Sequence, residues 1–318
     1  MADQFAELRA RAAVQDRLGE KKTTIAKRGV QVPVSPEREY VRVVNGFMRL
    51  YKRELEKMLP ELKKEYAKQR RAERAAGTRQ DSADDFMQFL TDAFARFGAF
   101  VLMIAEMFDL RKKIEAIGNL TVLYSTRQWK EVVFKSLGID IREDYYTGEF
   151  FREVLDLWTS ENVDLIVTIP RSSLGNMKDI VYKGWETGLN TRDIAKLIEK
   201  EYHTEKWHAQ FIARDQMAKL NAKITKKEQE DAGVSEYIWD SSEDERVRPD
   251  HREKNGHRFR WDDPPMIYNY TRSGGIRPSG RKCHPGEDFQ CRCVALPVFD
   301  YDALNFSGGL GTAFEERS

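Results

Sequence analysis

Helical periodicity dominates this chain as far as about Gly233 and limits what it can fold into. Apolar residues recur three and four positions apart, which places them on one face of a helix. The longest such helix is predicted to follow Ser35 and Pro36, a pair typical of an N-cap and a first helical position. Its apolar stripe must be buried on another helix of this chain or on another protein, and it consists of Val41, Val44, Met48, Tyr51, Leu55, Met58 and Leu62.

The same spacing predicts a series of further helices. Pro60 is expected to kink or divide the first one, and the polar run 65–79 to be an exposed linker or a fraying end. Residues 163–169 are rich in β-branched side chains and precede Pro170, so they fit either a strand or the end of a helix. The predicted helices cover about 83–115, with five phenylalanines in its core, and 125–137, 147–162, 174–188, 191–202 and 204–232.

The most apolar stretch, 97–108, is interrupted only by Glu106. Widening it toward the ~20 residues that span a bilayer brings in Asp92, Arg96 and Asp109. We therefore expect a buried helix and no membrane association.

The pattern changes after Gly233, where short β-prone runs occur at 237–239, 259–261 and 291–298. Pro249 and Gly256 are placed to begin and end one or two helical turns, and a long loop rich in Pro and Gly is expected at 262–290. The predicted fold is mainly α, with long helices and a helical bundle, plus a small C-terminal α+β module. Five segments are expected: a basic helical arm or linker (1–80), a helical domain (81–170), further helices (171–233), the α+β module (234–299) and a flexible tail (300–318).

Charge is spread unevenly along the chain. The formal net charge is +1, yet residues 1–80 hold 20 Lys and Arg against 11 Asp and Glu, a net of +9, and the remainder carries −8. A cationic arm on an acidic body suits an acidic partner surface or nucleic acid. The alternative is a solvated helix face rich in Lys and Arg.

All three cysteines lie between 283 and 293, too few and too clustered for a disulfide framework. The N-terminal residues lack the basic and apolar regions of a signal peptide, so folding in a reducing cytoplasm is expected.

The cysteines and nearby histidines predict a metal site. In an extended strand Cys291 and Cys293 would share one face with Cα atoms ~6.6 Å apart, poor for a disulfide but acceptable for two thiolates on one ion. His251 and His284, with Cys283 as a substitute, would complete a tetrahedral set for one structural zinc ion. The alternative is that the cysteines are small buried apolar residues and that His251 bonds locally.

A catalytic role is the competing interpretation. His251, Asn255 and His257 superficially resemble the residues of small metal-dependent nucleases, in which a histidine activates water beside a metal. However, residues 236–298 contain 11 basic and 11 acidic side chains, so no cationic field would attract DNA there. Asp244, Glu245 and Arg246 have the chemistry of acid–base groups, but a charged turn is the more ordinary reading.

An ordered set of motifs runs through the second half of the chain: Ala213-Arg214-Asp215-Gln216, Leu220-Asn221, Ala232-Gly233-Val234, Tyr237-Ile238-Trp239, Asp244-Glu245-Arg246, Arg248 to His251, Gly256, Trp261 to Pro264, His284-Pro285-Gly286 and Cys291-Arg292-Cys293. With these motifs the sequence from about 163 to 298 resembles the phage Mu F-like head-morphogenesis family, the minor head proteins of tailed phages. Where many relatives carry Cys-Pro-x-Cys, this chain has Arg248-Pro249-Asp250-His251, so His251 remains a candidate ligand while a four-thiol site is not expected. Residues 1–120 match no known pattern.

The resemblance implies a structural, non-enzymatic protein of the procapsid and virion. It would act in head assembly at the portal vertex or inside the capsid, with the portal and other head or scaffold proteins as partners, after synthesis in the host cytoplasm. Contact with viral DNA through the basic arm, and a metal-dependent nuclease or toxin-type enzyme, are the alternatives to test. Arg214, Asp215 and Arg248 are expected to form ion pairs joining the last long helix to the module, and the other structural motif residues are Gln216, Asn221, Trp239, Asp244, Arg246, Pro249 and Gly256.

Overall fold

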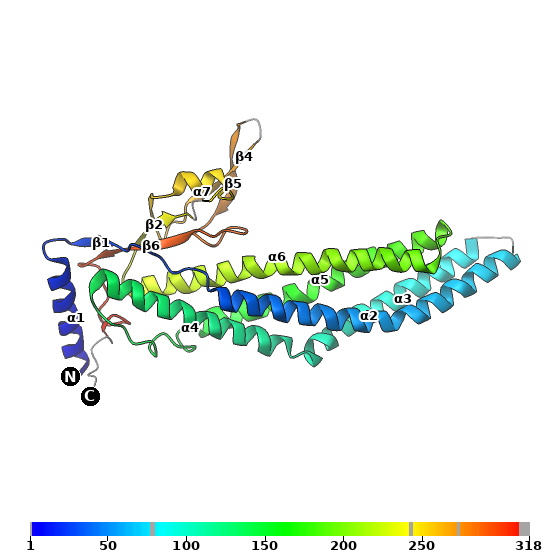
Figure 1. Ribbon diagram of the computed structural model, residues 1–318, viewed down its shortest axis with the longest axis horizontal. Coiled ribbons are helices and arrows are strands. Elements are labelled where there is room, and N and C mark those ends of the chain that lie inside the picture. The colour runs from blue at the N-terminus through cyan, green and yellow to red at the C-terminus, as the bar shows by residue number, and fades with distance from the viewer. Residues whose placement is uncertain (1, 77–79, 242–243, 272–273, 312–318) are drawn as a thin grey trace. The chain divides into compact units, whose positions relative to one another are not determined.

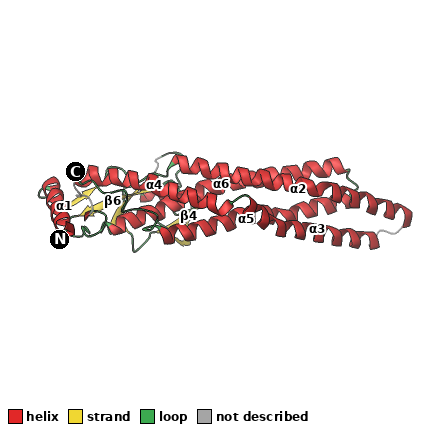
Figure 2. Ribbon diagram, turned by 90° about the horizontal axis from the view of Figure 1, so that it is seen from below, coloured by secondary structure: helices red, strands yellow, loops and turns green. Residues whose placement is uncertain are grey.

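Helices make up most of this protein (Figures 1 and 2). The computed structural model describes residues 2–76, 80–241, 244–271 and 274–311. The predicted fold class, mainly α with a small C-terminal α+β module, is confirmed. The helices are α1 (Ala2–Leu18), α2 (Val34–Ala76), α3 (Gln80–Met107), α4 (Leu110–Leu137), α5 (Arg152–Glu186), α6 (Thr191–Asp231) and α7 (Pro249–Lys254).

The strands form one antiparallel sheet of four and a separate hairpin. The larger sheet has the order β1-β6-β2-β3 and the hairpin pairs β4 with β5. Tyr237 faces Pro297 and Trp239 faces Ala295 across the β2–β6 ladder, and both aromatic rings are fully buried. The strands are β1 (Thr23–Ile25), β2 (Glu236–Asp240), β3 (Arg258–Arg260), β4 (Met266–Tyr270), β5 (Ile276–Lys282) and β6 (Val294–Asp300).

Contacts divide the chain into two compact units. Unit 1 comprises Met1–Glu37, Ile117–Trp158 and Arg214–Ser318, and unit 2 comprises Arg38–Ala116 and Thr159–Ala213. The units interleave in sequence because several long helices begin in one unit and end in the other.

The core of unit 2 buries the apolar stripe of α2. Val44, Met48, Tyr51, Leu55 and Leu62 are all less than 5% exposed. The Tyr51 ring packs on a phenylalanine of α3 with centroids 5.7 Å apart. Helices of this chain therefore bury the stripe. Periodicity alone left open whether this chain or another protein does so.

Two prolines predicted to interrupt helices do not end them. Pro60 lies inside α2 and Pro170 lies inside α5. The strand considered for 163–169 is wrong, and the separate helices expected at 147–162 and 174–188 are parts of α5. A proline in a helix costs ~3 kcal/mol, and burial of apolar residues on both sides of it outweighs that cost. The buried residues that flank Pro170 are Ile166, Val167, Ile169 and Leu174.

The start of α2 also differs from expectation. The helix begins at Val34, so Ser35 is not its N-cap and Pro36 lies in the first turn. A proline is tolerated there because the first N–H groups of a helix have no intrahelical partner.

Among the described helices, one segment, Asp84–Met107, is long and apolar enough to cross a membrane by length and composition. Within unit 2 one side of it is buried and Leu102, Met103 and Met107 are exposed. Its large buried side chains are Phe86, Leu90, Phe94, Phe97, Val101 and Ile104.

Two segments expected to be irregular have defined structure over their described residues. The loop predicted at 262–290 contains the β4–β5 hairpin. The flexible tail predicted for 300–318 is wrong for 301–311, because Leu304, Phe306 and Leu310 are buried there, and 312–318 lie outside the described residues. Apolar residues spaced between glycines let this segment turn back onto unit 1.

Candidate functional site

The C-terminal sheet of unit 1 is built on a small core of aromatic and sulfur side chains. The indole N–H of Trp261 donates to Gln229 of α6 (3.0 Å), and the Gln229 amide donates to the backbone carbonyl of Ala295 (3.2 Å). A buried glutamine thus fastens the sheet to α6. The core comprises Tyr237, Trp239, Trp261, Ile267, Cys291, Cys293 and Ala295.

The short helix α7 positions His251. Arg248 has an extended backbone at the N-cap and Pro249 takes the first helical position, as predicted. The helix ends at Lys254 with Asn255 as its C-cap, and Gly256 follows with φ +76°, a conformation that glycine adopts without strain. The Gly256 N–H donates to the Trp239 carbonyl (2.8 Å), which returns the chain to β2.

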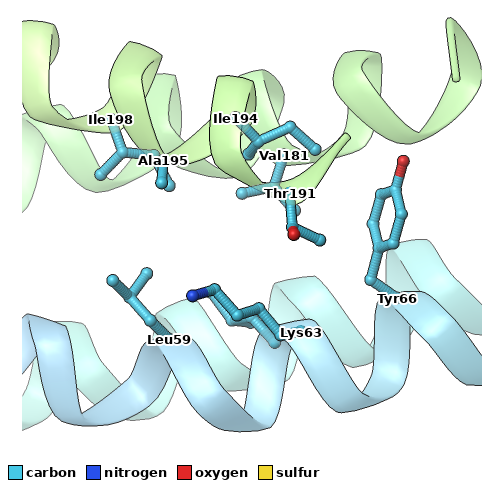
Figure 3. Close-up of a pocket in the computed structure, with 9 residues that line it drawn as sticks. Leu59, Lys63, Tyr66, Val181, Thr191, Ile194, Ala195 and Ile198 are labelled. Atoms are coloured by element: carbon cyan, nitrogen blue, oxygen red, sulfur yellow. The ribbon is translucent and has the colours of Figure 1, made fainter. Parts of the chain in front are cut away.

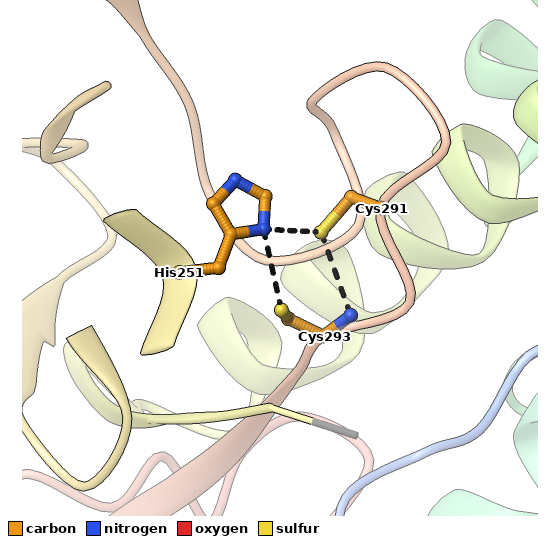
Figure 4. Close-up of side chains that lie close together, drawn as sticks. All are labelled: His251, Cys291 and Cys293. Carbon is orange, nitrogen blue, oxygen red and sulfur yellow. Dashed lines mark hydrogen bonds between the residues drawn. The ribbon is translucent and has the colours of Figure 1, made fainter. Parts of the chain in front are cut away.

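His251, Cys291 and Cys293 form a buried cluster (Figure 4). The His251 Nδ1 atom lies 3.5 Å from the Sγ atom of each cysteine. The three ligand atoms all lie within 4.8 Å of one another. Both cysteines occupy the irregular segment before β6, so the strand predicted to begin at Cys291 begins at Val294.

Asp288, which sequence reasoning did not single out, lies beside this cluster. Its carboxylate is 1% exposed and its Oδ2 atom is 3.3 Å from His251 Nε2. Arg248 donates to Oδ2 at 2.6 Å, and Arg281 contacts Oδ1 at 2.9 Å. Its only sequence signal was an acidic residue in the loop between His284 and Cys291.

Electrostatics in the cluster follow from these contacts. Burial alone would lower the pKa of His251, but its contacts with Asp288 and Cys291 outweigh burial and raise that pKa to about 9. Burial likewise opposes ionisation of Asp288, yet His251 and the two arginines hold its pKa at about 2. The Cys293 thiol and His251 lower the pKa of Cys291, whereas the adjacent Cys291 raises the pKa of Cys293. Cys291 is therefore the sulfur that ionises first.

The fourth predicted ligand lies elsewhere. His284 Nδ1 is 2.9 Å from the hydroxyl of Tyr237, and its ring packs on Trp261 with centroids 4.7 Å apart. Cys283, the predicted substitute, is partly buried against the sheet core. The cluster of His251 and two cysteines includes neither of them. Burial lowers the pKa of His284, in keeping with a neutral ring bonded to tyrosine.

The charged turn at 244–246 is tied to the cysteine segment. Arg292 donates both guanidinium nitrogens to Asp244, at 2.5 and 2.7 Å. Asp244 also accepts the backbone N–H of Arg246, whose exposed guanidinium lies 3.5 Å from the same carboxylate. The bond to Arg292 lowers the pKa of Asp244 to about 2.

The motif residues of α6 make contacts within unit 1. Asp215 is 3% exposed and accepts the backbone N–H of Gln290 at 2.7 Å, which joins α6 to the cysteine loop. Arg214 lies 3.3 Å from Glu37, at the start of α2. The Gln216 carbonyl accepts the indole N–H of Trp158 (3.2 Å).

Asn221, also on α6, is buried, and both its amide nitrogen and its amide oxygen make hydrogen bonds. Its amide donates to the carbonyl of Val30 (3.2 Å) and its oxygen accepts the Ser125 hydroxyl (2.8 Å). It therefore joins three separate parts of unit 1.

Two cavities differ in character. One in unit 1 has a volume of about 190 Å³ and is lined by the cluster residues together with Val247, Gln290 and four arginines: Arg214, Arg246, Arg248 and Arg292. The other, in unit 2, has about 30 Å³ and lies between apolar side chains of α2, α5 and α6, such as Leu59 and Ile198 (Figure 3). The second has room for about one water molecule and is a packing gap.

Comparison with known proteins places this site within a family. Residues 176–296 match the family described as Phage Mu protein F like protein. A protein of Haemophilus influenzae, described only as uncharacterized, is 35% identical over 163 residues, which is 51% of this chain and 33% of the relative. The chain thus spans about a third of the length of that relative, and no solved structure matches it. The resemblance seen in the sequence is confirmed: residues 176–296, which include His251, Cys291 and Cys293, are a region of the Phage Mu protein F like family.

Proposed function

We propose that this protein is a structural minor head protein of a tailed phage, which acts in head morphogenesis without catalysing a reaction. The family match supports the phage head assignment. In this proposal the protein is a component of the virion and is made in the host cytoplasm during assembly.

The observation that carries the proposal is that motif side chains bond to segments of unit 1 that are distant in the sequence. Asp215 binds the loop before Cys291, Arg248 binds Asp288 in that loop, and Arg292 binds Asp244. Each pair joins segments that are 40 or more residues apart in the sequence. A charged group held in a complete ion pair is suited to rigidity, since proton transfer to a substrate would break the pair.

The partners in this proposal are the portal protein and neighbouring head or scaffold proteins. Unit 1 would supply a rigid contact surface at the portal vertex, and the basic residues of 1–80 would contact acidic partner surfaces or viral DNA. The uneven charge along the chain supports this. Residues 1–80 carry a net positive charge while the whole chain has a net charge of only +1, so an acidic partner would be attracted to that segment.

The test is to count and locate the chain in particles of the phage that encodes it. Quantitative mass spectrometry of purified procapsids is expected to find a few copies per head, and cryo-electron microscopy to place them beside the portal. Heads made without the chain are expected to be aberrant. Absence from procapsids and virions, or hundreds of copies over the shell, would contradict the proposal.

The enzyme alternative has its own test. Purified protein is incubated with plasmid DNA and Mg²⁺, Mn²⁺ or Zn²⁺, beside the His251→Ala variant and a His203→Ala control, whose imidazole is 61% exposed. We expect no cleavage of the plasmid by the parent protein or by either variant. Cleavage that is lost in His251→Ala and kept in His203→Ala would overturn the structural assignment.

A further inference from the structure

We propose that Nδ1 of His251 and the Sγ atoms of Cys291 and Cys293 bind one zinc ion, whose fourth position opens into the arginine-lined cavity of unit 1. The inference is independent of the proposed function, because it rests on the local geometry of three side chains. The zinc would hold α7 and the cysteine segment together.

The distances fit a tetrahedral ion. With Zn–S of about 2.3 Å and Zn–N of about 2.0–2.1 Å, tetrahedral angles place a nitrogen and a sulfur ligand about 3.6 Å apart. Both His251–cysteine distances are 3.5 Å. Two sulfur ligands of one zinc lie about 3.8 Å apart, and the two Sγ atoms here lie within 4.8 Å, so a small rotation of one side chain closes the set.

The backbone around Cys291 favours its charged form. Its Sγ atom accepts the N–H of Gly286 (3.3 Å) and the N–H of Cys293 (3.4 Å). Thiolate is the form of cysteine that binds a metal, and donors pointed at sulfur stabilise that charge. A cysteine serving only as a small apolar residue would have no need of two such donors.

Asp288 supplies the support that a metal-binding histidine ordinarily has. Ligand histidines commonly point their second nitrogen at a carboxylate, which fixes the ring and strengthens the ligand. The Asp288 carboxylate lies 3.3 Å from Nε2 of His251, and Arg248 and Arg281 hold that carboxylate in place. This arrangement leaves Nδ1 facing the two sulfurs.

The cavity determines the fourth ligand. It has a volume of about 190 Å³, ample for water, and all three ligand residues line it. The sequence had predicted His284 as the fourth ligand, but His284 bonds to Tyr237 instead. Four arginines in the lining make the open position suited to a water molecule or a small anion.

The first experiment measures metal in the intact protein. Protein produced with zinc and purified without chelator is analysed by elemental mass spectrometry, beside Cys291→Ser, Cys293→Ser and His251→Ala. Matched controls are Cys283→Ser and His257→Ala. We expect one zinc per chain in the parent and both controls, and loss of stoichiometric zinc in the three ligand variants. A zinc-free parent that is folded by circular dichroism, or loss of zinc in Cys283→Ser, would overturn the site.

Cobalt substitution keeps the test decisive if a ligand variant fails to fold. Co²⁺ added to the metal-free parent is expected to show the visible bands of a tetrahedral ion and charge-transfer absorption from two thiolates. Azide is expected to shift the bands by entering the open position. Absorption from three thiolates, or bands that azide does not change, would contradict the proposed ligand set.

The Asp288→Asn variant tests the contribution of the Asp288 carboxylate to zinc binding separately from that of the three ligands. It keeps all three ligand atoms, and removing such a carboxylate lowers metal affinity by about 10–100-fold. Chelator competition on folded protein measures this ratio. Unchanged affinity would contradict the positioning role of Asp288.

Discussion

Glu228 is a single residue whose protonation the fold controls. It lies in the last turns of α6, fully buried, and accepts one hydrogen bond, from Thr126 (3.1 Å). Burial, which the Thr126 bond only partly offsets, raises its pKa well above the ordinary value, with a further contribution from Asp231. Burial in the folded protein therefore favours the protonated form of this carboxyl.

This arrangement predicts a pH-dependent effect of Glu228→Gln. The folded state binds the proton more tightly than the unfolded state, so stability falls as the pH rises above the ordinary pKa of 4.5. Glutamine keeps the shape without that loss. We expect equal melting temperatures for variant and parent near pH 4, and a higher one for the variant at pH 8.

Thermal melts from pH 4 to 8 measure this difference. Glu230→Gln, at an exposed position of the same helix, serves as the control and should follow the parent. A difference between Glu228→Gln and the parent that is constant across the pH range would contradict the assignment.

At the scale of elements, Gly233 lies where the end of α6 packs against the 301–311 segment. Gly233 follows the helix with φ +78°, and a Cβ atom there would lie 2.2 Å from the carbonyl oxygen of Ala303. Gly256 follows α7 with φ +76°, but a Cβ atom there would meet nothing within 4 Å. The two positions share the same backbone strain and differ only in packing.

The pair predicts unequal losses from the same substitution. Gly256→Ala adds only the left-handed strain, about 1–2 kcal/mol. Gly233→Ala adds that strain and a clash with the backbone of the 301–311 segment, so we expect it to lose several kcal/mol or fail to fold. Urea unfolding measures both, and equal losses would show that the 301–311 segment does not pack as described.

At the scale of the whole molecule, the charge asymmetry predicts where nucleic acid would bind. In unit 1, Lys21, Lys27 and Arg28 are exposed near β1. If residues 1–80 contact DNA, changing these three to Glu is expected to weaken retention. It should also reduce the slope of log K against log salt by about 0.9 per lost phosphate contact.

The control for this experiment has the same net charge. Arg111, Lys112 and Lys183 of unit 2 are also exposed, and changing them to Glu alters the total charge by the same amount. Filter binding at several salt concentrations compares both variants with the parent. Equal weakening would assign binding to overall charge, and no retention by the parent at low salt would contradict DNA contact.

The sequence by itself determined the features that depend on neighbours along the chain. Periodicity predicted the long helices, Pro249 and Gly256 predicted α7, and short runs of β-prone residues predicted β2 and β3. The ordered motif from Ala213 to Cys293 identified the family region. These signals are local, because helix faces, strand faces and caps are set by residues within a few positions.

Only the tertiary structure decided the features that depend on distant contacts. Packing carried α2 and α5 through Pro60 and Pro170, and paired the short β1 with β6. It also placed His284 on Tyr237 and Asp288 beside His251. The physical reason is that burial free energy and hydrogen-bond partners come from segments far apart in the chain, which no local pattern records.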